Sequence, residues 1–125
     1  MITVADRSRL QHQLKRVAAL LKDAPQAALD QLDAMTAEQS SHPAILHMQG
    51  IALRMTGCAA DAVTVLDRLI ALDASFAPAW YERALARRAM RQYRSSLEDL
   101  QKSVALKPDF APAWRTLGDA LAANG

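Results

Sequence analysis

The pentapeptide FAPAW occupies residues 76–80 and occurs again, unchanged, at residues 110–114. Every residue of the first copy therefore recurs 34 positions later, as Trp80 does at Trp114. An identity of this length that includes Phe, Pro and Trp indicates an internal repeat. This repeat length is typical of solenoids in which each repeat is a helix–turn–helix unit. The pentapeptide thus predicts an all-α protein that acts by binding.

The composition agrees with a helical chain. Of the 125 residues, 51% are hydrophobic and only 4 are glycine, and a sequence dominated by alanine and leucine favours helix. The formal net charge of +2 is too small an excess to indicate nucleic-acid binding by itself. Cys58 is the single cysteine, so no intrachain disulfide can form and a reducing compartment is expected.

The N-terminal residues contain no apolar run of signal-peptide length, and no stretch approaches the roughly 20 apolar residues of a membrane span. We therefore expect a soluble, cytoplasmic protein.

Apolar residues at helical spacing, separated by Pro, Gly and Ser, divide the chain into helix–turn–helix units. The helices are expected at about 6–22, from Pro25 onward, and at about 43–55, 59–72, 77–90, 93–106 and 111–123. Ser40 or Ser41 is available to cap the helix that opens at Pro43. Gly57 is expected to take the positive φ of a helix C-terminus.

These residues resemble the tetratricopeptide repeat, whose pattern runs Trp-x-x-Leu-Gly-x-x-Tyr, then Ala-x-x-x-Phe, then Pro. Trp114, Leu117 and Gly118 match the opening of that pattern letter for letter. Earlier matches are Trp80, Ala84, Leu100 and Pro108, then Gly50, Ala62 and Leu66, then Ala28 and Leu32. In the first and most degenerate repeat, His12 and Arg16 stand at the Trp and Gly positions.

The resemblance implies a right-handed α-solenoid of antiparallel helix pairs, with about seven helices in three and a half repeats. The repeats would span about 9–42, 43–76 and 77–110, followed by a half repeat at 111–125, all within one domain covering residues 1–125. Small residues at Gly50, Ala84 and Gly118 would let paired helices approach closely.

In the repeated pentapeptide, Trp80 and Trp114 are expected to wedge between successive helix pairs. Phe76 and Phe110 are expected to close the preceding pair.

Arg83 and Arg87 depart from the pattern, because both occupy positions that are usually apolar or aromatic. Two alternatives follow. Their long stems can pack while the guanidinium groups reach solvent, or one of them can find an acidic partner such as Asp61 or Glu98.

The resemblance also implies a scaffold that binds a partner peptide or segment in a concave groove lined by the first helix of each pair. The groove residues it indicates are Gln13, Val17, Leu20, His47, Ile51, Arg54, Tyr81, Leu85, Arg88, Arg115 and Asp119. Arg54, Arg88 and Arg115 place one guanidinium in each successive repeat. A row of such groups over an apolar floor suits a peptide with carboxylates, although the same arginines can simply form a solvated face.

The family's site for a C-terminal carboxylate uses Lys and Asn on the inner wall. The corresponding places here hold Gln13, Val17, Met48 and Pro78. We therefore expect no binding of chaperone C-termini.

No catalytic, metal or cofactor site is expected, and the chain is not expected to be an enzyme. The four glycines are scattered and form no phosphate-binding loop. His12, His42 and His47 have no metal-ligand spacing with one another or with Cys58. Cys58 also falls in a turn without a neighbouring histidine, so we interpret it as a free thiol.

A nucleic-acid surface would rest on Arg83, Arg87, Arg88, Arg91 and Arg94. Those arginines spread around more than one side of a helix, and acidic residues dilute their field, so nucleic acid is not the expected partner.

The helix expected at 111–123 is a first-of-pair helix without its mate. Gly118 would let a following helix come close, and Leu117 and Leu121 would pack on it. A longer protein, a capping role or pairing with a second molecule would each explain that bare face. We favour the longer protein. Several larger bacterial proteins, such as those similar to sulfotransferases, have an N-terminal tetratricopeptide arm that resembles this chain. The alternative function is therefore an accessory or dimerisation arm of a larger enzyme that continues past Gly125.

Overall fold

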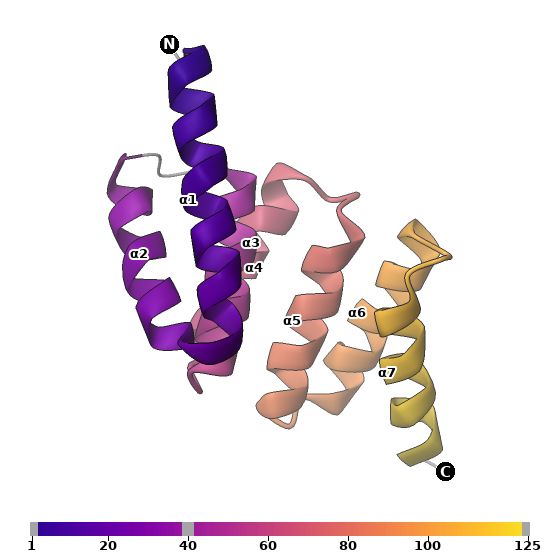
Figure 1. The fold of residues 1–125 in the computed structure, drawn as a ribbon. Coiled ribbons are helices and arrows are strands. Elements are labelled where there is room, and N and C mark those ends of the chain that lie inside the picture. Colours follow the sequence, from indigo (N-terminus) through magenta and orange to yellow (C-terminus); the bar gives the residue numbers. More distant parts are fainter. Residues whose placement is uncertain (1–2, 39–41, 124–125) are drawn as a thin grey trace.

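The computed structural model describes residues 3–38 and 42–123, and this part of the chain contains seven α-helices and no strand (Figure 1). The helices are α1 (Val4–Asp23), α2 (Pro25–Glu38), α3 (Pro43–Met55), α4 (Ala59–Leu72), α5 (Ala77–Ala89), α6 (Tyr93–Leu106) and α7 (Ala111–Ala123). The expected helices are confirmed, with boundaries within two residues of those predicted.

The helix ends follow local capping chemistry. At the start of α1 the Thr3 hydroxyl accepts the Asp6 N–H, while the Asp6 carboxylate accepts the Thr3 N–H, each at 3.1 Å. These reciprocal hydrogen bonds form a capping box. The N-cap of α3 is His42, whose Nδ1 accepts the Ala44 N–H at 3.2 Å. Ser40 and Ser41, the expected caps, lie outside the described residues.

Two of the three turns within helix pairs contain a left-handed residue, and the turn at Ala24, between α1 and α2, does not. Gly57, between α3 and α4, has a φ of +86°, as predicted. Arg91, the equivalent residue one repeat later, lies between α5 and α6 and has a φ of +62°. Glycine takes this conformation without steric cost, whereas a residue with a Cβ takes it only at a steric cost.

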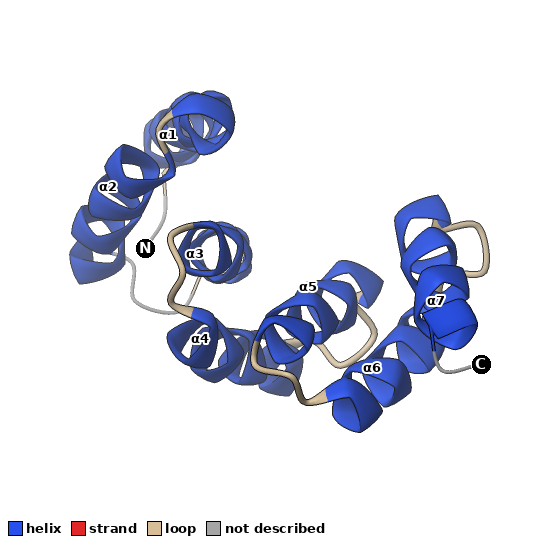
Figure 2. Ribbon diagram, turned by 90° about the horizontal axis from the view of Figure 1, so that it is seen from below, coloured by secondary structure: helices blue, strands red, loops and turns tan. Residues whose placement is uncertain are grey.

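The helices form an arc in which α1, α3, α5 and α7 line the inner side and α2, α4 and α6 the outer side (Figure 2). The buried side chains form clusters that follow one another along the arc. One buried cluster joins α1, α2 and α3, a second joins α3, α4 and α5, and a third joins α5, α6 and α7. Each cluster therefore couples one helix pair to the first helix of the next repeat, as in a solenoid.

Gly50 shows why a small residue is needed where paired helices meet. A Cβ at this position would lie 2.6 Å from Cδ2 of Leu66 on α4, which is closer than real contacts allow. Arg16 occupies the equivalent place on α1 and is exposed. Two pockets, of about 220 and 450 Å³, lie beside it, and Gln31 of α2 lines both. The first helix pair is accordingly less closely packed there than the second.

The prediction that Trp80 and Trp114 lie between successive helix pairs is wrong, because neither indole belongs to a buried cluster. Trp80 donates its Nε1–H to the Ala74 carbonyl at 2.9 Å, and Trp114 donates to the Pro108 carbonyl at 2.7 Å. Each ring therefore holds the loop that precedes its own helix. Arg83 and Lys102 lie over the Trp80 ring, with their charged groups 4.9 and 5.7 Å from its centroid.

Three of the four alanines in the two copies of the pentapeptide enter the core instead, and Ala111 is exposed. Ala77, Ala79 and Ala113 are buried. Phe76 packs against the buried cluster of α3, α4 and α5, and Phe110 packs against that of α5, α6 and α7, which agrees with their expected role in closing the preceding pair.

Arg83 and Arg87 both have an acidic partner, but neither Asp61 nor Glu98 supplies it. Asp99 on α6 accepts Arg83 Nε at 3.0 Å, Arg83 Nη2 at 2.8 Å and Arg87 Nη1 at 2.8 Å. Arg83 Nη1 also donates to Asp67 on α4 at 2.8 Å. The side chain of Asp99 is only 3% exposed, whereas that of Asp67 is 52% exposed. The network therefore joins α5 to α6 through a buried carboxylate and α5 to α4 through an exposed one.

Candidate functional site

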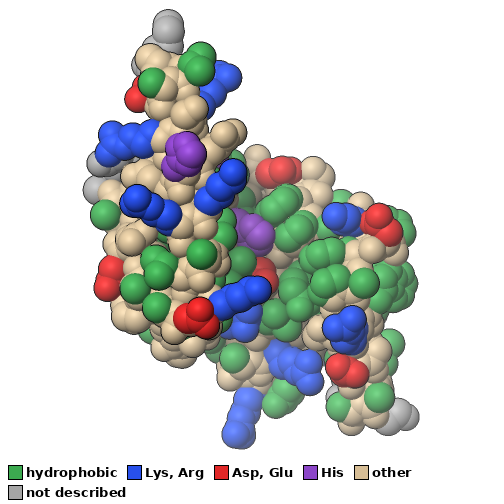
Figure 3. Space-filling view, viewed as in Figure 1, with side chains coloured by type: hydrophobic (Ala, Val, Ile, Leu, Met, Phe, Trp, Pro, Cys, Tyr) green, Lys and Arg blue, Asp and Glu red, His purple; other side chains and the backbone are tan. Residues whose placement is uncertain are grey.

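The inner side of the arc is the candidate site, and Figure 3 shows this face. Hydrophobic side chains gather between the flanks formed by α1 and α7, and Lys and Arg side chains lie mainly around and below them. Ile51 on α3 and Tyr81 and Leu85 on α5 are half-buried. These side chains are accessible but are held by packing, so they can form the floor of a binding surface.

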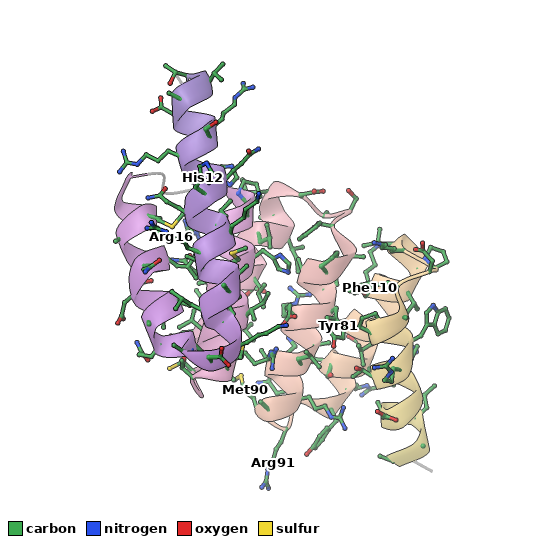
Figure 4. The ribbon with its side chains drawn as sticks, viewed as in Figure 1. His12, Arg16, Tyr81, Met90, Arg91 and Phe110 are labelled. Carbon is green, nitrogen blue, oxygen red and sulfur yellow. The ribbon has the colours of Figure 1, made fainter. Side chains whose placement is uncertain are left out.

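Two aromatic pairs connect successive inner helices. His47 on α3 meets Phe76 edge-on, with ring centroids 5.1 Å apart and an interplanar angle of 88°. Tyr81 on α5 meets Phe110 in the same way, at 5.4 Å and 83°, just before α7 (Figure 4). Both members of the second pair lie 34 positions after those of the first. Burial lowers the pKa of His47, which favours the neutral imidazole.

The three arginines expected to form one row differ in their environments. Arg54 donates its Nε–H to Oε2 of Glu82 at 3.1 Å, and the two side chains are 28% and 11% exposed. Burial raises the pKa of Glu82 in spite of this partner. Arg88 and Arg115, in contrast, are exposed and form no ion pair with any described residue.

The remaining expected groove residues divide between surface and core. Gln13 is half-buried and lines a pocket beside α2. Val17 is fully buried in the first cluster, so it cannot reach a ligand. Leu20 is partly buried and packs against the same cluster. Asp119 is exposed on α7, one turn after Arg115.

The residues expected at the C-terminal contact also separate. Leu117 is buried among Ala84, Leu100, Val104 and Ala113, so it faces α5 and α6 and not a following helix. Gly118 has open space where a Cβ would be, and Leu121 is 51% exposed. Within this set, only Gly118 and Leu121 remain available for an intermolecular contact.

Two pockets were not anticipated from the sequence. One, of about 320 Å³, is lined by His42, Pro43, Ala44, His47, Leu69, Asp73 and Phe76. The other, of about 470 Å³, is lined by Arg88, Tyr93, Ser96, Ala120 and Ala123. Each combines residues from three neighbouring segments, including second-of-pair helices that the groove pattern does not cover. The sequence signal beside the second pocket is Thr116 on α7, which stands 34 positions after Glu82 and replaces its acid.

No group of three or more His, Cys, Asp or Glu in residues 3–38 and 42–123 could hold a metal ion. Cys58 is exposed at the start of α4. No helix in the described part of the chain is both long and apolar enough to cross a membrane. Two of the five arginines considered for nucleic acid, Arg83 and Arg87, form ion pairs with Asp99, and Arg83 also pairs with Asp67.

No family model matches the sequence, and no curated protein matches it either. Solved structures do match the fold. The first TPR domain of the human RPAP3 protein aligns with a TM-score of 0.80 and 20% identity, over 89% of this chain and 91% of that one. MamA aligns with a TM-score of 0.81 and 24% identity, over 97% and 71% of the two chains. The first TPR of Spaghetti (RPAP3), bound to the HSP90 peptide SRMEEVD, aligns with a TM-score of 0.81 and 18% identity, over 90% of both chains.

Proposed function

Because the chain has the fold of a tetratricopeptide-repeat domain, we propose that it is a protein-interaction scaffold whose inner face binds an extended or helical segment of a partner protein. The observation that carries the proposal is the joint presence of an apolar floor and unpaired cations. Ile51, Tyr81 and Leu85 are half-buried on the inner helices, and Arg88 and Arg115 have no acidic partner among the described residues.

The chemistry of this face defines the expected partner segment. Apolar side chains of the segment would pack on the floor, where half-buried aromatic and aliphatic groups lose little entropy on binding. Carboxylates of the segment would pair with the guanidinium groups, which suit planar two-oxygen acceptors. The likeness to a domain that was solved with a bound HSP90 peptide is consistent with such a partner.

The proposal is tested by selecting a display library of random peptides on the protein and measuring the selected peptides by titration calorimetry. Leu85→Glu places a charge on the apolar floor, and Gln101→Glu places the same charge on the exposed surface of α6, an outer helix. We expect the first change to abolish binding and the second to leave it intact. Equal binding to both variants, or no selected peptide at all, would contradict the proposed function.

A second candidate function, an arm that self-associates with a second copy of the chain, is favoured by one specific observation. Gly50 makes room for Leu66 of α4, whereas the equivalent Gly118 faces open space beside the exposed side chains of Trp114 and Leu121. Light scattering over a range of protein concentrations tests it. Self-association through α7 predicts a mass that rises with concentration and that Leu121→Glu returns to the monomer value. A monomeric mass throughout excludes this candidate.

A further inference from the structure

The joint between α3 and α5 contains an ion pair whose counterpart is missing at the next joint. Arg54 and Arg88 are equivalent residues, 34 positions apart, in the last turns of α3 and α5. Glu82 on α5 accepts the Arg54 Nε–H at 3.1 Å. The residue equivalent to Glu82 on α7 is Thr116, which has no carboxylate. Its hydroxyl donates to the Pro112 carbonyl of its own helix at 3.0 Å.

Arg88 therefore keeps its position in the repeat but has lost the internal acid. It is exposed and has no ion-pair partner among the described residues. The pocket of about 470 Å³ lies next to it, and Ala120, one helical turn after Thr116, lines that pocket. The missing acid and the pocket thus occur on the same side of α7.

The other lining residues suit an acidic side chain. Ser96 is buried and already donates its hydroxyl to the Ala84 carbonyl at 2.8 Å, so Arg88 and the exposed Tyr93 provide the available polar groups. Ala120 and Ala123 form apolar walls that can contact methylene groups. A guanidinium beside a phenol hydroxyl offers several donors and, at neutral pH, no anionic acceptor. A carboxylate is the complementary ligand.

We infer that this pocket is a carboxylate subsite, in which Arg88 binds the Asp or Glu side chain of a partner segment as Arg54 binds Glu82. The inference rests on the proposed function and specifies the partner chemistry of that same surface. It also assigns different roles to two equivalent arginines. Arg54 is satisfied within the chain and stabilises the α3–α5 joint, whereas Arg88 is available to a partner. Acidic residues of the partner would accordingly be selected beside Arg88 and not beside Arg54.

Position 116 offers a direct test, because Thr116→Glu would restore the internal acid. The variant should place a carboxylate at the position on α7 that is equivalent to Glu82 on α5. This carboxylate should compete with a bound peptide for Arg88. Thr116→Gln has nearly the same shape without the charge and serves as the matched control. Arg88→Gln removes the guanidinium from an exposed position, so it should fold normally, as circular dichroism would verify.

The experiment selects a display library of random peptides on the wild type and on the three variants in parallel. We expect wild-type and Thr116→Gln selections to enrich Asp or Glu at a fixed distance from the apolar residues. The Thr116→Glu and Arg88→Gln selections should keep the apolar preference and lose the acidic one. In calorimetry, a synthetic wild-type-selected peptide should bind these two variants about tenfold to a hundredfold more weakly. Replacing its acidic residue by the corresponding amide should have the same effect on wild-type binding.

The failures are distinguishable. Peptides that bind all four proteins equally, with no acidic preference, would overturn the carboxylate subsite and leave the scaffold function standing. Acidic enrichment that is also lost in Thr116→Gln would overturn the subsite, because the packing of α7 and not the charge would then be responsible. Free glutarate that displaces the peptide at equal concentration would show a small-carboxylate site instead of a peptide subsite. If no peptide is selected on the wild type, the proposed function itself fails.

A readout without any ligand tests the geometry on which the inference depends. If position 116 is within reach of Arg88, Thr116→Glu should raise the midpoint of chemical denaturation relative to Thr116→Gln. Adding Arg88→Gln should remove that gain. An unchanged midpoint in all combinations would show that the two positions do not meet, and the comparison with Arg54 and Glu82 would no longer support the subsite.

Discussion

His47 and Phe76 meet edge-on with ring centroids 5.1 Å apart, and Tyr81 and Phe110 repeat this contact in the next repeat. Histidine in one repeat thus does the packing that tyrosine does in the following one. The two residues differ in their titration, because only the imidazole changes its charge near neutral pH. The α3–α5 joint is therefore expected to be pH-sensitive in a way that the α5–α7 joint is not.

His47→Tyr should remove this sensitivity. Burial lowers the pKa of His47 in the folded protein, so the unfolded chain takes up a proton at higher pH than the folded one. The contribution of His47 to stability is therefore complete above the ordinary pKa of about 6.5 and is lost as the pH falls below it. Urea denaturation at about pH 7.5 and 5.5 measures the effect. The loss of unfolding free energy between these pH values should be smaller for His47→Tyr than for the wild type.

His42 and Asp73 line the same pocket as His47 and are unchanged in that variant, so the comparison isolates the one imidazole. The same pH dependence in both proteins would contradict the assignment.

Asp99→Asn should destabilise the fold. The Asp99 carboxylate is almost fully buried and accepts hydrogen bonds from both Arg83 and Arg87. Its removal would leave two partly buried guanidinium groups without their shared anion, at a cost of about 3 kcal/mol of unfolding free energy. Glu98→Gln changes the neighbouring carboxylate, which is exposed, and should alter stability by less than about 0.5 kcal/mol. Equal effects of the two substitutions in guanidinium denaturation would refute the role given to Asp99.

Arg91→Gly should stabilise the protein. Arg91 adopts a φ of +62°, and the equivalent Gly57 adopts +86°. A residue with a Cβ is strained in this region, and relief of that strain should outweigh the extra freedom of glycine in the unfolded chain. The expected gain is about 0.5–1 kcal/mol of unfolding free energy. Figure 4 shows Arg91 projecting away from the body of the protein, so its side chain should not be missed.

Gly57→Ala is the reciprocal change and should lose about 1 kcal/mol by the same argument. Thermal or urea denaturation measures both variants. A loss of stability in Arg91→Gly would mean that the arginine makes a contribution that outweighs its backbone strain.

The HSP90 peptide SRMEEVD should bind this chain more weakly than about 1 μM. The places that correspond to the terminal-carboxylate site of tetratricopeptide-repeat domains hold Gln13, Val17, Met48 and Pro78, and Val17 is fully buried. Any residual binding should therefore depend on the acidic side chains and not on the free C-terminus. Calorimetry with the free and the amidated peptide should give the same affinity. Micromolar binding that amidation abolishes would show that the chain holds a terminal carboxylate after all.

The sequence predicted the helices well because their boundaries depend on local signals. Pro43 and the two copies of FAPAW mark helix starts, and Gly57 takes the left-handed conformation that ends α3. The constant spacing between equivalent residues then places neighbouring helices in order. The capping box of Thr3 and Asp6 could also have been recognised, because it follows a known spacing of a hydroxyl and an acid.

The side-chain partners were less predictable, because they depend on how each helix is rotated about its axis. Asp99 and not Glu98 meets the arginines, although the two are adjacent in sequence, since one residue corresponds to about 100° of helix rotation. Arg54 was expected to face a ligand, but its partner Glu82 lies 28 residues away on the next inner helix. Trp80 occupies its position in the repeat, yet the pattern does not say that the small Ala79 takes the core site beside it.

The central claim is that a partner segment binds on the inner face of the arc. Its most direct test is a map of backbone amide shifts measured by NMR while a library-selected peptide is titrated into the labelled protein. We predict that the largest shifts lie on the inner helices α3, α5 and α7, around Ile51, Leu85 and Arg88. Shifts confined to the outer helices α2, α4 and α6, or to the exposed face of α7 around Gly118 and Leu121, would contradict the claim.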